Sequence, residues 1–178
     1  NVFVAKAVVF EGPEDYHKRL NNKKLKIDEN SILIIRGCGP VGYPGSAEVI
    51  NMQPPDRLLK KGINTLPTLG DGRQSGTSAS PSILHVSPES AVGGDLGIVK
   101  TGDKIKIDLN KRRVDLLISK SEFKNRRKKR KKFKINNQTP WQEIFRDTVG
   151  QLEDGACIKS RGIYLKVSTS KGIPRDSH

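Results

Sequence analysis

The chain has 178 residues and a formal net charge of +14, with 34% hydrophobic and 29% charged residues. This length suits one domain, or one domain with an extension, and is sufficient for a hydrophobic core. No apolar run approaches the roughly 20 residues that a membrane span requires, and no signal-peptide pattern opens the chain. The two cysteines, Cys38 and Cys157, are too few for a disulfide framework or a self-contained metal site. We therefore expect a cytoplasmic protein that does not contact a membrane.

Most of the net charge lies in one short segment. Ten basic residues and a single acid, Glu122, fall between Lys120 and Lys134. A localised run of this kind is more often a solvated helix face than a reader of nucleic acid, which would need interleaved aromatics or a groove-reading motif. We expect a solvated helix here and do not expect nucleic-acid recognition, although a basic nucleic-acid-binding module stays an alternative.

The first elements in chain order are two strands with a helix between them. Residues 4–10 are β-branched and apolar, and residues 31–36 have four consecutive apolar positions, so both segments are predicted strands. Pro13 suits the first turn of a helix over residues 14–21. Residues 37–45 follow the second strand with four glycines and two prolines, which favours a fixed loop over a flexible linker.

A short helix is predicted to follow that loop. Ser46 can cap a helix that begins near Ala47, which places Glu48 in its first turn. An acid there usually complements the helix dipole. The alternative is a carboxylate that the rigid loop aims into a site.

The next stretch, residues 68–95, is rich in glycine and hydroxyl residues. It follows a second short helix at 56–61 and an apolar run at 63–69. Glycine permits close approach of the backbone to a ligand, and binding residues usually sit on loops that a rigid scaffold holds. The stretch therefore indicates a binding loop, with a flexible surface loop as the alternative.

The second half of the chain is predicted to contain short strands and then helices. Strands are expected at residues 83–86, with His85 on one face, and at 97–100, 104–109 and 113–119. The last two alternate apolar and polar positions, which is typical of a hairpin with one face exposed to solvent. Residues 138–149 have apolar positions spaced for one helical face and are predicted to form a docking helix. Strands mixed with short helices indicate an α+β or barrel-like domain.

Several collinear strings resemble one enzyme family. They are GPVGYPGSAEV (39–49), GDGRQSGTS (70–78), ILHVSPESAVGG (83–94), GDKIKIDL (102–109) and DLLIS (115–119). Together they are similar to the C-terminal domain of the dihydroxy-acid dehydratase and 6-phosphogluconate dehydratase family. The longer strings GYPGSAEVINMQPP and GDGRQSGTSASPSIL, with TPWQEI and the ending GIPRDSH, resemble its sugar-acid branch, which includes L-arabinonate and D-xylonate dehydratases. The basic run after Glu122 is denser than the family pattern.

The resemblance implies a fold and a domain organisation. Residues 1–135 are expected to form a swivelling β/β/α barrel-like domain with short helices. Residues 136–178 are expected to form a C-terminal helical extension that packs on this domain or on a neighbouring subunit. In the family an N-terminal domain, absent from this chain, holds an iron–sulfur cluster and most ligands of a Mg²⁺ ion. Neither Cys38 nor Cys157 lies at a position that resembles a cluster ligand.

The resemblance also implies a reaction and site residues. The family removes water from a 2,3-dihydroxy acid: a base takes the C2 proton, the metal centre draws away the C3 hydroxyl, and the enol relaxes to a 2-keto-3-deoxy acid. Ser75 resembles the base, and Glu48 resembles the single Mg²⁺ ligand from this domain. Thr77 resembles a substrate contact, and the N–H groups of Gly76 and Thr77 are expected to hold the substrate carboxylate. A serine hydroxyl becomes a competent base only when its alkoxide is stabilised, as a nearby metal centre can do.

Two substrate classes follow from the resemblance. The first is an aldonic (sugar) acid, which would make the protein a hydro-lyase of carbohydrate metabolism when it is joined to its own N-terminal domain. The second is the smaller substrate of a dihydroxy-acid dehydratase in branched-chain amino-acid synthesis. Under either reading the expected partners are the acid substrate, the N-terminal domain and further copies in a homo-oligomer.

Overall fold

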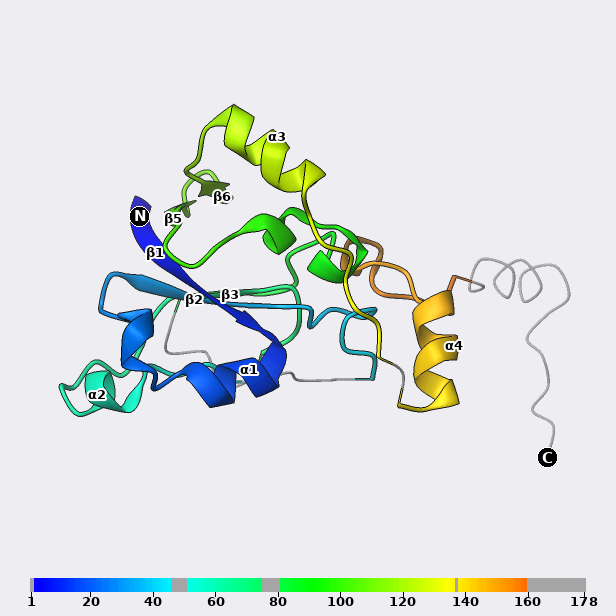
Figure 1. Cartoon of the computed structure of the whole chain (residues 1–178), viewed down its shortest axis with the longest axis horizontal. Helices are drawn as coiled ribbons and strands as arrows, with labels where there is room; N and C mark the ends of the chain where they lie inside the picture. The colour runs from blue at the N-terminus through cyan, green and yellow to red at the C-terminus, as the bar shows by residue number, and fades with distance from the viewer. Residues whose placement is uncertain (1, 46–50, 75–80, 137, 160–178) are drawn as a thin grey trace, which may run out of the picture.

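A computed structural model shows one mixed β-sheet flanked by helices (Figure 1). The structure describes residues 2–45, 51–74, 81–136 and 138–159. Six strands lie in the order β4-β3-β2-β1-β5-β6. Their bounds are β1 Val2–Glu11, β2 Ser31–Arg36, β3 Thr68–Gly70, β4 Ser82–Ile83, β5 Lys104–Asp108 and β6 Arg113–Leu116. The neighbours from β1 to β4 pair in parallel, whereas β5 pairs antiparallel with both β1 and β6. The chain is therefore of α+β class, as predicted.

The two central strands, β1 and β2, are buried on both faces. Successive side chains of a strand point to opposite faces of the sheet. Val9 accordingly packs in one hydrophobic cluster with residues of β5 and of the segment that precedes it, while Val8 and Phe10 pack in a second cluster with residues of the helices. Burial on both faces explains why residues 31–36 read as a continuous apolar run instead of an alternating one.

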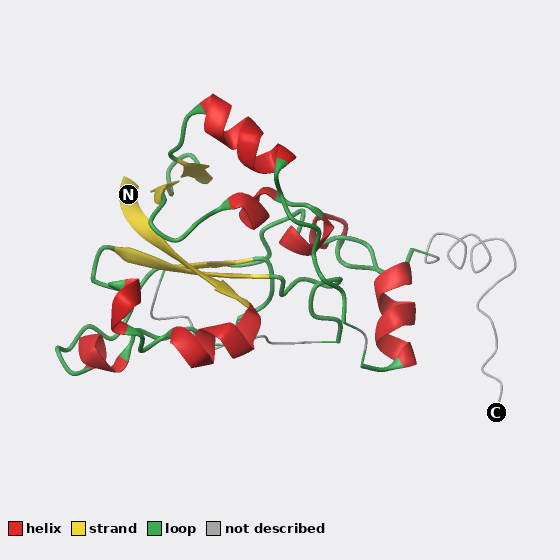
Figure 2. Ribbon diagram, viewed as in Figure 1, coloured by secondary structure: helices red, strands yellow, loops and turns green. Residues whose placement is uncertain are grey.

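The helices lie on both sides of the sheet (Figures 1 and 2). Helices α1 (Gly12–Arg19) and α2 (Asp56–Leu59) lie on one side, α3 (Lys120–Lys128) lies on the other, and α4 (Pro140–Thr148) lies at the end of the molecule away from α2. Short 3-10 helices complete the fold: η1 Lys23–Leu25, η2 Ser90–Val92, η3 Asp95–Ile98 and η4 Leu152–Asp154. Within the described ranges, no helix is long and apolar enough to cross a membrane.

The strongest patterns in the sequence are confirmed. The strand predicted at 4–10 is the core of β1, the strand predicted at 31–36 is β2, and the hairpin is β5 with β6. Helix α1 has its proline in the first turn, as expected. The helix expected near Ala47 lies outside the described residues.

Two predicted strands are wrong at least in part. The segment 97–100 is not a strand: its first two residues end η3, and the two that follow belong to no strand. The strand predicted at 83–86 ends at Ile83, and His85 has a left-handed backbone with φ 57° instead of lying on a strand face. The N–H of His85 donates to the Gly72 carbonyl, and the N–H of Val86 donates to the Gly70 carbonyl. The chain therefore turns across the end of β3 after β4.

The basic segment is a helix only in its first part. Ser119 caps α3 by accepting a hydrogen bond from the N–H of Glu122, and the helix ends at Lys128. Beyond it the Arg130 guanidinium donates to the carbonyl of Gly93, and the Phe133 ring lies over Gly37, where a Cβ would come within 2.8 Å of it. The prediction of a solvated helix is confirmed for residues 120–128 and wrong for residues 129–134, which run back over the main domain.

Helix α4 begins and ends close to the prediction. Thr139 and Gln142 form a capping box, in which each side chain accepts a hydrogen bond from the other residue's backbone N–H. Trp141 and Ile144 are 78% and 52% exposed. The part of the chain that the structure describes leaves this apolar face uncovered, so docking of the helix stays a prediction.

Candidate functional site

The two loops that lead toward the predicted site residues begin where the parallel strands β2 and β3 end. The loop 37–45 follows β2, and residues 71–74 follow β3, so both segments leave the same edge of the sheet. Ligands of open α/β sheets bind at the carboxyl ends of parallel strands. The two segments touch: a Cβ on Gly72 would lie 2.4 Å from the carbonyl oxygen of Cys38. Glycine is therefore required at position 72 for this contact.

The Asp71 carboxylate joins three segments at this edge. It is fully buried. Its oxygens accept hydrogen bonds from the N–H groups of Gly37 at 3.0 Å, Cys38 at 2.9 Å and Ser90 at 2.8 Å. The Ser90 hydroxyl donates to it as well, at 2.5 Å. A buried carboxylate that accepts several N–H groups fixes their positions, because each alternative position leaves a buried polar group unpaired.

A second carboxylate, that of Glu89, holds the next part of the loop. It is fully buried. One oxygen accepts from the N–H of Val41 at 2.9 Å and the other from the N–H of Gly42 at 2.8 Å. A Cβ at Gly39 would lie 2.5 Å from a Glu89 carboxylate oxygen, and a Cβ at Gly42 would lie 2.5 Å from the carbonyl oxygen of Gly37. The glycines of the loop thus make room for the carboxylate and for a tight turn of the backbone.

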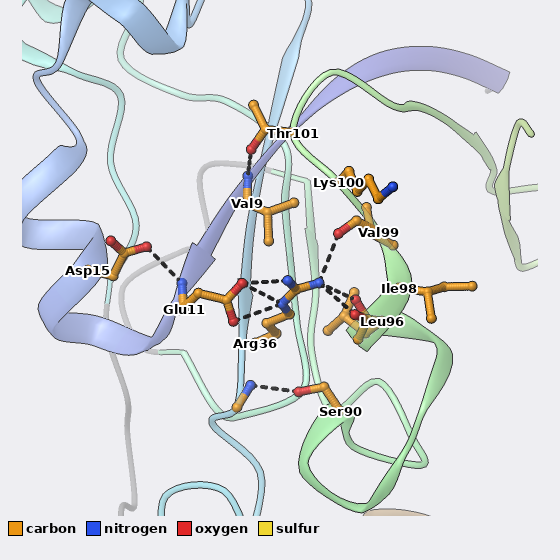
Figure 3. A network of polar contacts seen from close by, with 12 residues as sticks. Val9, Glu11, Asp15, Arg36, Ser90, Leu96, Ile98, Val99, Lys100 and Thr101 are labelled. Atoms are coloured by element: carbon orange, nitrogen blue, oxygen red, sulfur yellow. Dashed lines mark hydrogen bonds and ion pairs between the residues drawn. The ribbon is translucent and has the colours of Figure 1, made fainter. Parts of the chain in front are cut away.

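Arg36 joins the end of β2 to the end of β1 and to η3 (Figure 3). Its Nε lies 3.0 Å from both carboxylate oxygens of Glu11. Its Nη1 lies 2.8–3.1 Å from the carbonyl oxygens of Leu96, Gly97 and Val99. The Arg36 guanidinium therefore pairs with the Glu11 carboxylate at the end of β1. It also donates to the carbonyl groups of residues 96–99, which pair with no strand of the described sheet.

The Cys38 thiol lies in a buried and acidic environment. The thiol is buried. Burial raises its pKa well above the ordinary value, and the negative charges of Asp71, Glu14, Glu89 and Glu11 raise it further. The thiolate is the form that binds iron and attacks electrophiles. At neutral pH the Cys38 thiol is therefore expected to stay protonated.

The described residues do not supply a metal centre by themselves. Outside the residues that the structure leaves undescribed, no group of three or more His, Cys, Asp or Glu side chains is placed to hold a metal ion. The buried carboxylates of Asp71 and Glu89 are occupied by backbone N–H groups. This part of the chain therefore does not fit an iron–sulfur cluster or a complete Mg²⁺ site.

The residues predicted for the site itself cannot be placed. Ser75, Gly76, Thr77 and Glu48 all lie outside the described residues. The loop 37–45 leads toward Glu48, and residues 71–74 lead toward Ser75. Both segments are held by the hydrogen bonds to the Asp71 and Glu89 carboxylates.

The Gln74 side chain lies directly before the predicted base. It is 9% exposed. Neither its amide nitrogen nor its amide oxygen has a hydrogen-bond partner among the described residues. Its amide nitrogen lies close to Gly70 of β3, where a Cβ would come within 2.9 Å of it.

A cavity of about 370 Å³ opens beside the loop. Its walls come from the ends of β1 and β2, from the loop residues Gly42, Tyr43 and Pro44, and from residues between Phe133 and Arg146. The size is at the lower end of the range for small-molecule sites. Polar and charged side chains predominate in its walls, so it suits a small polar ligand more than an apolar one.

Sequence reasoning missed the residues that build this edge. Asp71 and Glu89 fall within the predicted binding stretch 68–95, and Arg36 ends a predicted strand, without a role of their own. The one available signal was the combination of acids and glycines: Asp71 stands between two glycines, and a loop with four glycines in nine residues needs acceptors for its N–H groups. That signal indicates a buried acid without identifying which one.

Both arginines in the helical part of the basic segment are held in ion pairs. Arg126 pairs with Asp103 at 2.5 Å and with Glu122 at 2.7 Å, and both Arg126 and Asp103 are largely buried. Arg127 pairs with Asp95 at 2.6 Å. The lysines that follow line a wider hollow of about 620 Å³ against η3. The exposed charge is thus carried mainly by flexible lysines, which bind anions as point charges without fixed geometry.

We expect the protein to bind nucleic acid only weakly and without sequence preference. Raising the salt from 50 to 200 mM should weaken any binding on the order of a hundredfold, because the contacts are between lysines and phosphates. Titration of duplex and single-stranded oligonucleotides of several sequences measures this, with a Lys131→Ala/Lys132→Ala double variant as control. Tight binding at physiological salt, or a preference for one sequence, would contradict the expectation and revive the binding-module reading.

Comparisons with known proteins identify the family. The profile described as dihydroxy-acid/6-phosphogluconate dehydratase C-terminal matches residues 1–156. The chain is 53% identical over 177 residues to a D-xylonate dehydratase of Caulobacter vibrioides, with 99% of this chain and 29% of that protein covered. It is 39% identical over 180 residues to an L-arabinonate dehydratase of Rhizobium leguminosarum bv. trifolii, with 99% of this chain and 30% of that protein covered.

The match extends to another branch of the family. The chain is 38% identical over 151 residues to a dihydroxy-acid dehydratase of Thermodesulfovibrio yellowstonii, with 84% of this chain and 27% of that protein covered. The chain thus spans about three tenths of the length of the curated relatives it matches. The ordered motifs, the profile and the relatives agree: the chain belongs to the dihydroxy-acid/6-phosphogluconate dehydratase C-terminal family.

Proposed function

We propose that this chain is the C-terminal part of a dehydratase that converts an aldonic acid to a 2-keto-3-deoxy acid. The observation that supports the proposal best is the arrangement at the strand ends. Buried carboxylates fix the two loops that lead to Glu48 and to Ser75, and these loops are in contact through Gly72 and Cys38. Catalytic constellations need such rigid support, since misplacement of a reacting group by about 1 Å can cost 10²-fold in rate.

The role that we propose for this chain in the reaction is removal of the C2 proton. Ser75 is the proposed base, and Gly76 and Thr77 are proposed to hold the substrate carboxylate through their N–H groups. The C3 hydroxyl then leaves as hydroxide, which combines with the proton taken from C2 to give water, and the resulting enol tautomerises to the 2-keto-3-deoxy acid.

An iron–sulfur cluster and a Mg²⁺ ion are part of the proposal only for the full-length protein. The described residues supply no metal centre. We propose that the cluster and most ligands of Mg²⁺ lie outside this chain, and that Glu48 is the one ligand contributed from it. Such groups supply Lewis acidity and stabilise developing negative charge.

An aldonic acid is favoured over the smaller branched-chain substrate by the degree of similarity. Identity is 53% to the D-xylonate dehydratase and 38% to the dihydroxy-acid dehydratase of Thermodesulfovibrio yellowstonii. The second substrate class remains the alternative. Four further features are likewise proposals. They are a swivelling β/β/α barrel-like domain over residues 1–135, a C-terminal extension over residues 136–178, a homo-oligomer and a cytoplasmic location.

The experiment that tests the proposal is an assay of the full-length protein. D-xylonate, L-arabinonate and a branched 2,3-dihydroxy acid are supplied in turn, and the 2-keto acid is measured. Turnover of a sugar acid with a higher kcat/KM than that of the branched acid is expected. Preference for the branched acid would select the alternative, and no turnover of any of the acids would reject the dehydratase proposal.

The 178-residue chain alone is expected to be inactive. A Mg²⁺ site needs near-octahedral oxygen ligands from several groups, and only one presumed ligand comes from this chain. The purified chain is assayed with the same acids at high protein concentration, with the full-length protein as the positive control. Turnover by the isolated chain would contradict the proposed division of the site.

A further inference from the structure

The segment that contains α4 and η4 contacts the glycine-rich loop directly. The Nε of Arg146, in α4, donates to the carbonyl of Val41 at 2.8 Å. Gln151, which directly precedes η4, forms two hydrogen bonds with Glu89, the residue whose carboxylate holds Val41 and Gly42. Residues 138–159, called here the C-terminal segment, are therefore part of the support of the loop 37–45.

The contact between Gln151 and Glu89 uses both ends of one amide. The amide oxygen of Gln151 accepts from the N–H of Glu89 at 3.0 Å, and its amide nitrogen donates to a Glu89 carboxylate oxygen at 2.9 Å. That same oxygen accepts from the N–H of Val41. A side chain at position 151 must therefore present one acceptor and one donor, side by side, to a buried carboxylate.

The position of Gln151 is itself well fixed. The neighbouring Val149 is only 2% exposed and pairs with Ile158 in an antiparallel bridge. The carbonyl of Gln151 accepts from the N–H groups of Asp154 and Ala156. Because the backbone on both sides is tied down, the amide approaches Glu89 from a rigid support and not from a mobile tail.

The position of Glu89 leaves little space for adjustment. The carboxylate is fully buried and lies so close to Gly39 that a Cβ there would be 2.5 Å from it. If Gln151 no longer held it, one carboxylate oxygen would lose one of its two donors, and the Glu89 N–H would lose its acceptor. Buried groups that lose a partner move or admit water, because an unpaired charged group is costly in a medium of low dielectric constant.

We propose that Gln151 is a positioning residue: through Glu89 it sets the conformation of the loop 37–45 and thereby the direction in which the chain leaves Gly45 toward Glu48. The inference rests on the proposed function for its catalytic readout. It assigns to the C-terminal segment a role in the active site of its own chain, in addition to any packing against another part of the protein.

The test uses variants of the full-length protein. Gln151→Leu replaces the amide by an apolar side chain of similar volume and so removes both hydrogen bonds to Glu89. Glu153→Leu, an exposed position in η4, is the matched control. We expect Gln151→Leu to lower kcat about tenfold with KM changed less than about twofold, since it misplaces a site loop without touching substrate. The control is expected to behave like the parent.

A second variant distinguishes positioning from a general loss of structure. In Gln151→Glu a new carboxylate faces that of Glu89 at neutral pH, and like charges at this distance raise the pKa of the pair. When it binds a proton, the new carboxyl has one O–H donor and one carbonyl acceptor, the same pattern as the amide. Its kcat relative to the parent should therefore recover as the pH falls from about 8 to about 5. The carboxylates of Asp71, Glu14 and Glu11, which act on the nearby Cys38, and the Arg146 guanidinium, which donates to the Val41 carbonyl, are present in every variant.

Hydrogen exchange gives a readout that does not depend on catalysis. The N–H groups of Val41 and Gly42 donate to Glu89. Faster exchange confined to the peptide 39–44 is expected in Gln151→Leu and is not expected in Glu153→Leu.

The outcomes separate this inference from the proposed function. Unchanged exchange in Gln151→Leu would overturn the inference, as would parental kcat in that variant or a kcat for Gln151→Glu that does not recover at low pH. If the parent protein has no dehydratase activity, the proposed function fails, and exchange at residues 39–44 alone decides whether Gln151 positions the loop.

Discussion

Replacement of Ser75 by alanine in the full-length protein is expected to lower kcat by about 10²–10⁴-fold, the usual cost of removing a general base. KM for the acid should change little, because the hydroxyl is proposed to accept a proton in the transition state and not to anchor the substrate. Steady-state kinetics with a sugar acid measure both values.

The control for this substitution is Ser121→Ala, which removes an exposed hydroxyl from α3. A Ser75→Ala variant with near-parental kcat would rule out the assignment of the base. An increase in KM with unchanged kcat would instead make Ser75 a binding residue, since loss of uniform binding raises KM alone.

Replacement of Asp71 by alanine is expected to destabilise the protein by at least about 3 kcal/mol. The change leaves the N–H groups of Cys38 and Ser90 without their acceptor, whereas the N–H of Gly37 keeps a second one, the Ser90 hydroxyl. Asp71→Asn should cost less but should still destabilise, because its amide nitrogen must face at least one of these donors. Urea or thermal unfolding measures the change.

Asp147→Ala is the control for this prediction, because Asp147 is exposed in α4. It is expected to change stability by no more than about 0.5 kcal/mol. If Asp71→Ala proved as stable as the control, Asp71 would not be the fixed centre of the three segments that it joins.

The central strands and the hairpin could be predicted because their signals are local. Residues 31–36 are apolar without interruption since β2 is buried on both faces, and β5 alternates because only Ile105 and Ile107 face the core. These patterns do not reveal the strand order. The position of β5 beside β1 depends on contacts about a hundred residues apart, such as Phe3 with Ile107.

Tertiary contacts decided the elements that were predicted wrongly. Gly97–Lys100 has the composition of a strand, but the carbonyls of Leu96, Gly97 and Val99 accept from Arg36 and not from a neighbouring strand. The lysines after Lys128 have the same intrinsic helix propensity as the lysines before it. The chain leaves the helix where Arg130 and Phe133 find partners at Gly93 and Gly37, which no local pattern encodes.

The candidate site was predictable only in its motifs. The glycine- and hydroxyl-rich strings indicated which loops matter, and resemblance gave Ser75 and Glu48 their expected roles. The support of those loops was not visible, because Asp71 and Glu89 bind backbone N–H groups, which every residue except proline possesses. The partners Gln151 and Glu89 are 62 positions apart and have no sequence signature that links them.

The short edge strands of the sheet limit how another polypeptide can join it. The outer strands, β4 and β6, contain two and four residues. Addition of a strand from a partner requires an exposed edge with a row of unpaired backbone groups, and such short edges offer few of them. Recruitment of the remainder of the enzyme by β-augmentation is therefore disfavoured. We expect association to occur through side chains at the ends of the strands, where the loops 37–45 and 71–74 lie.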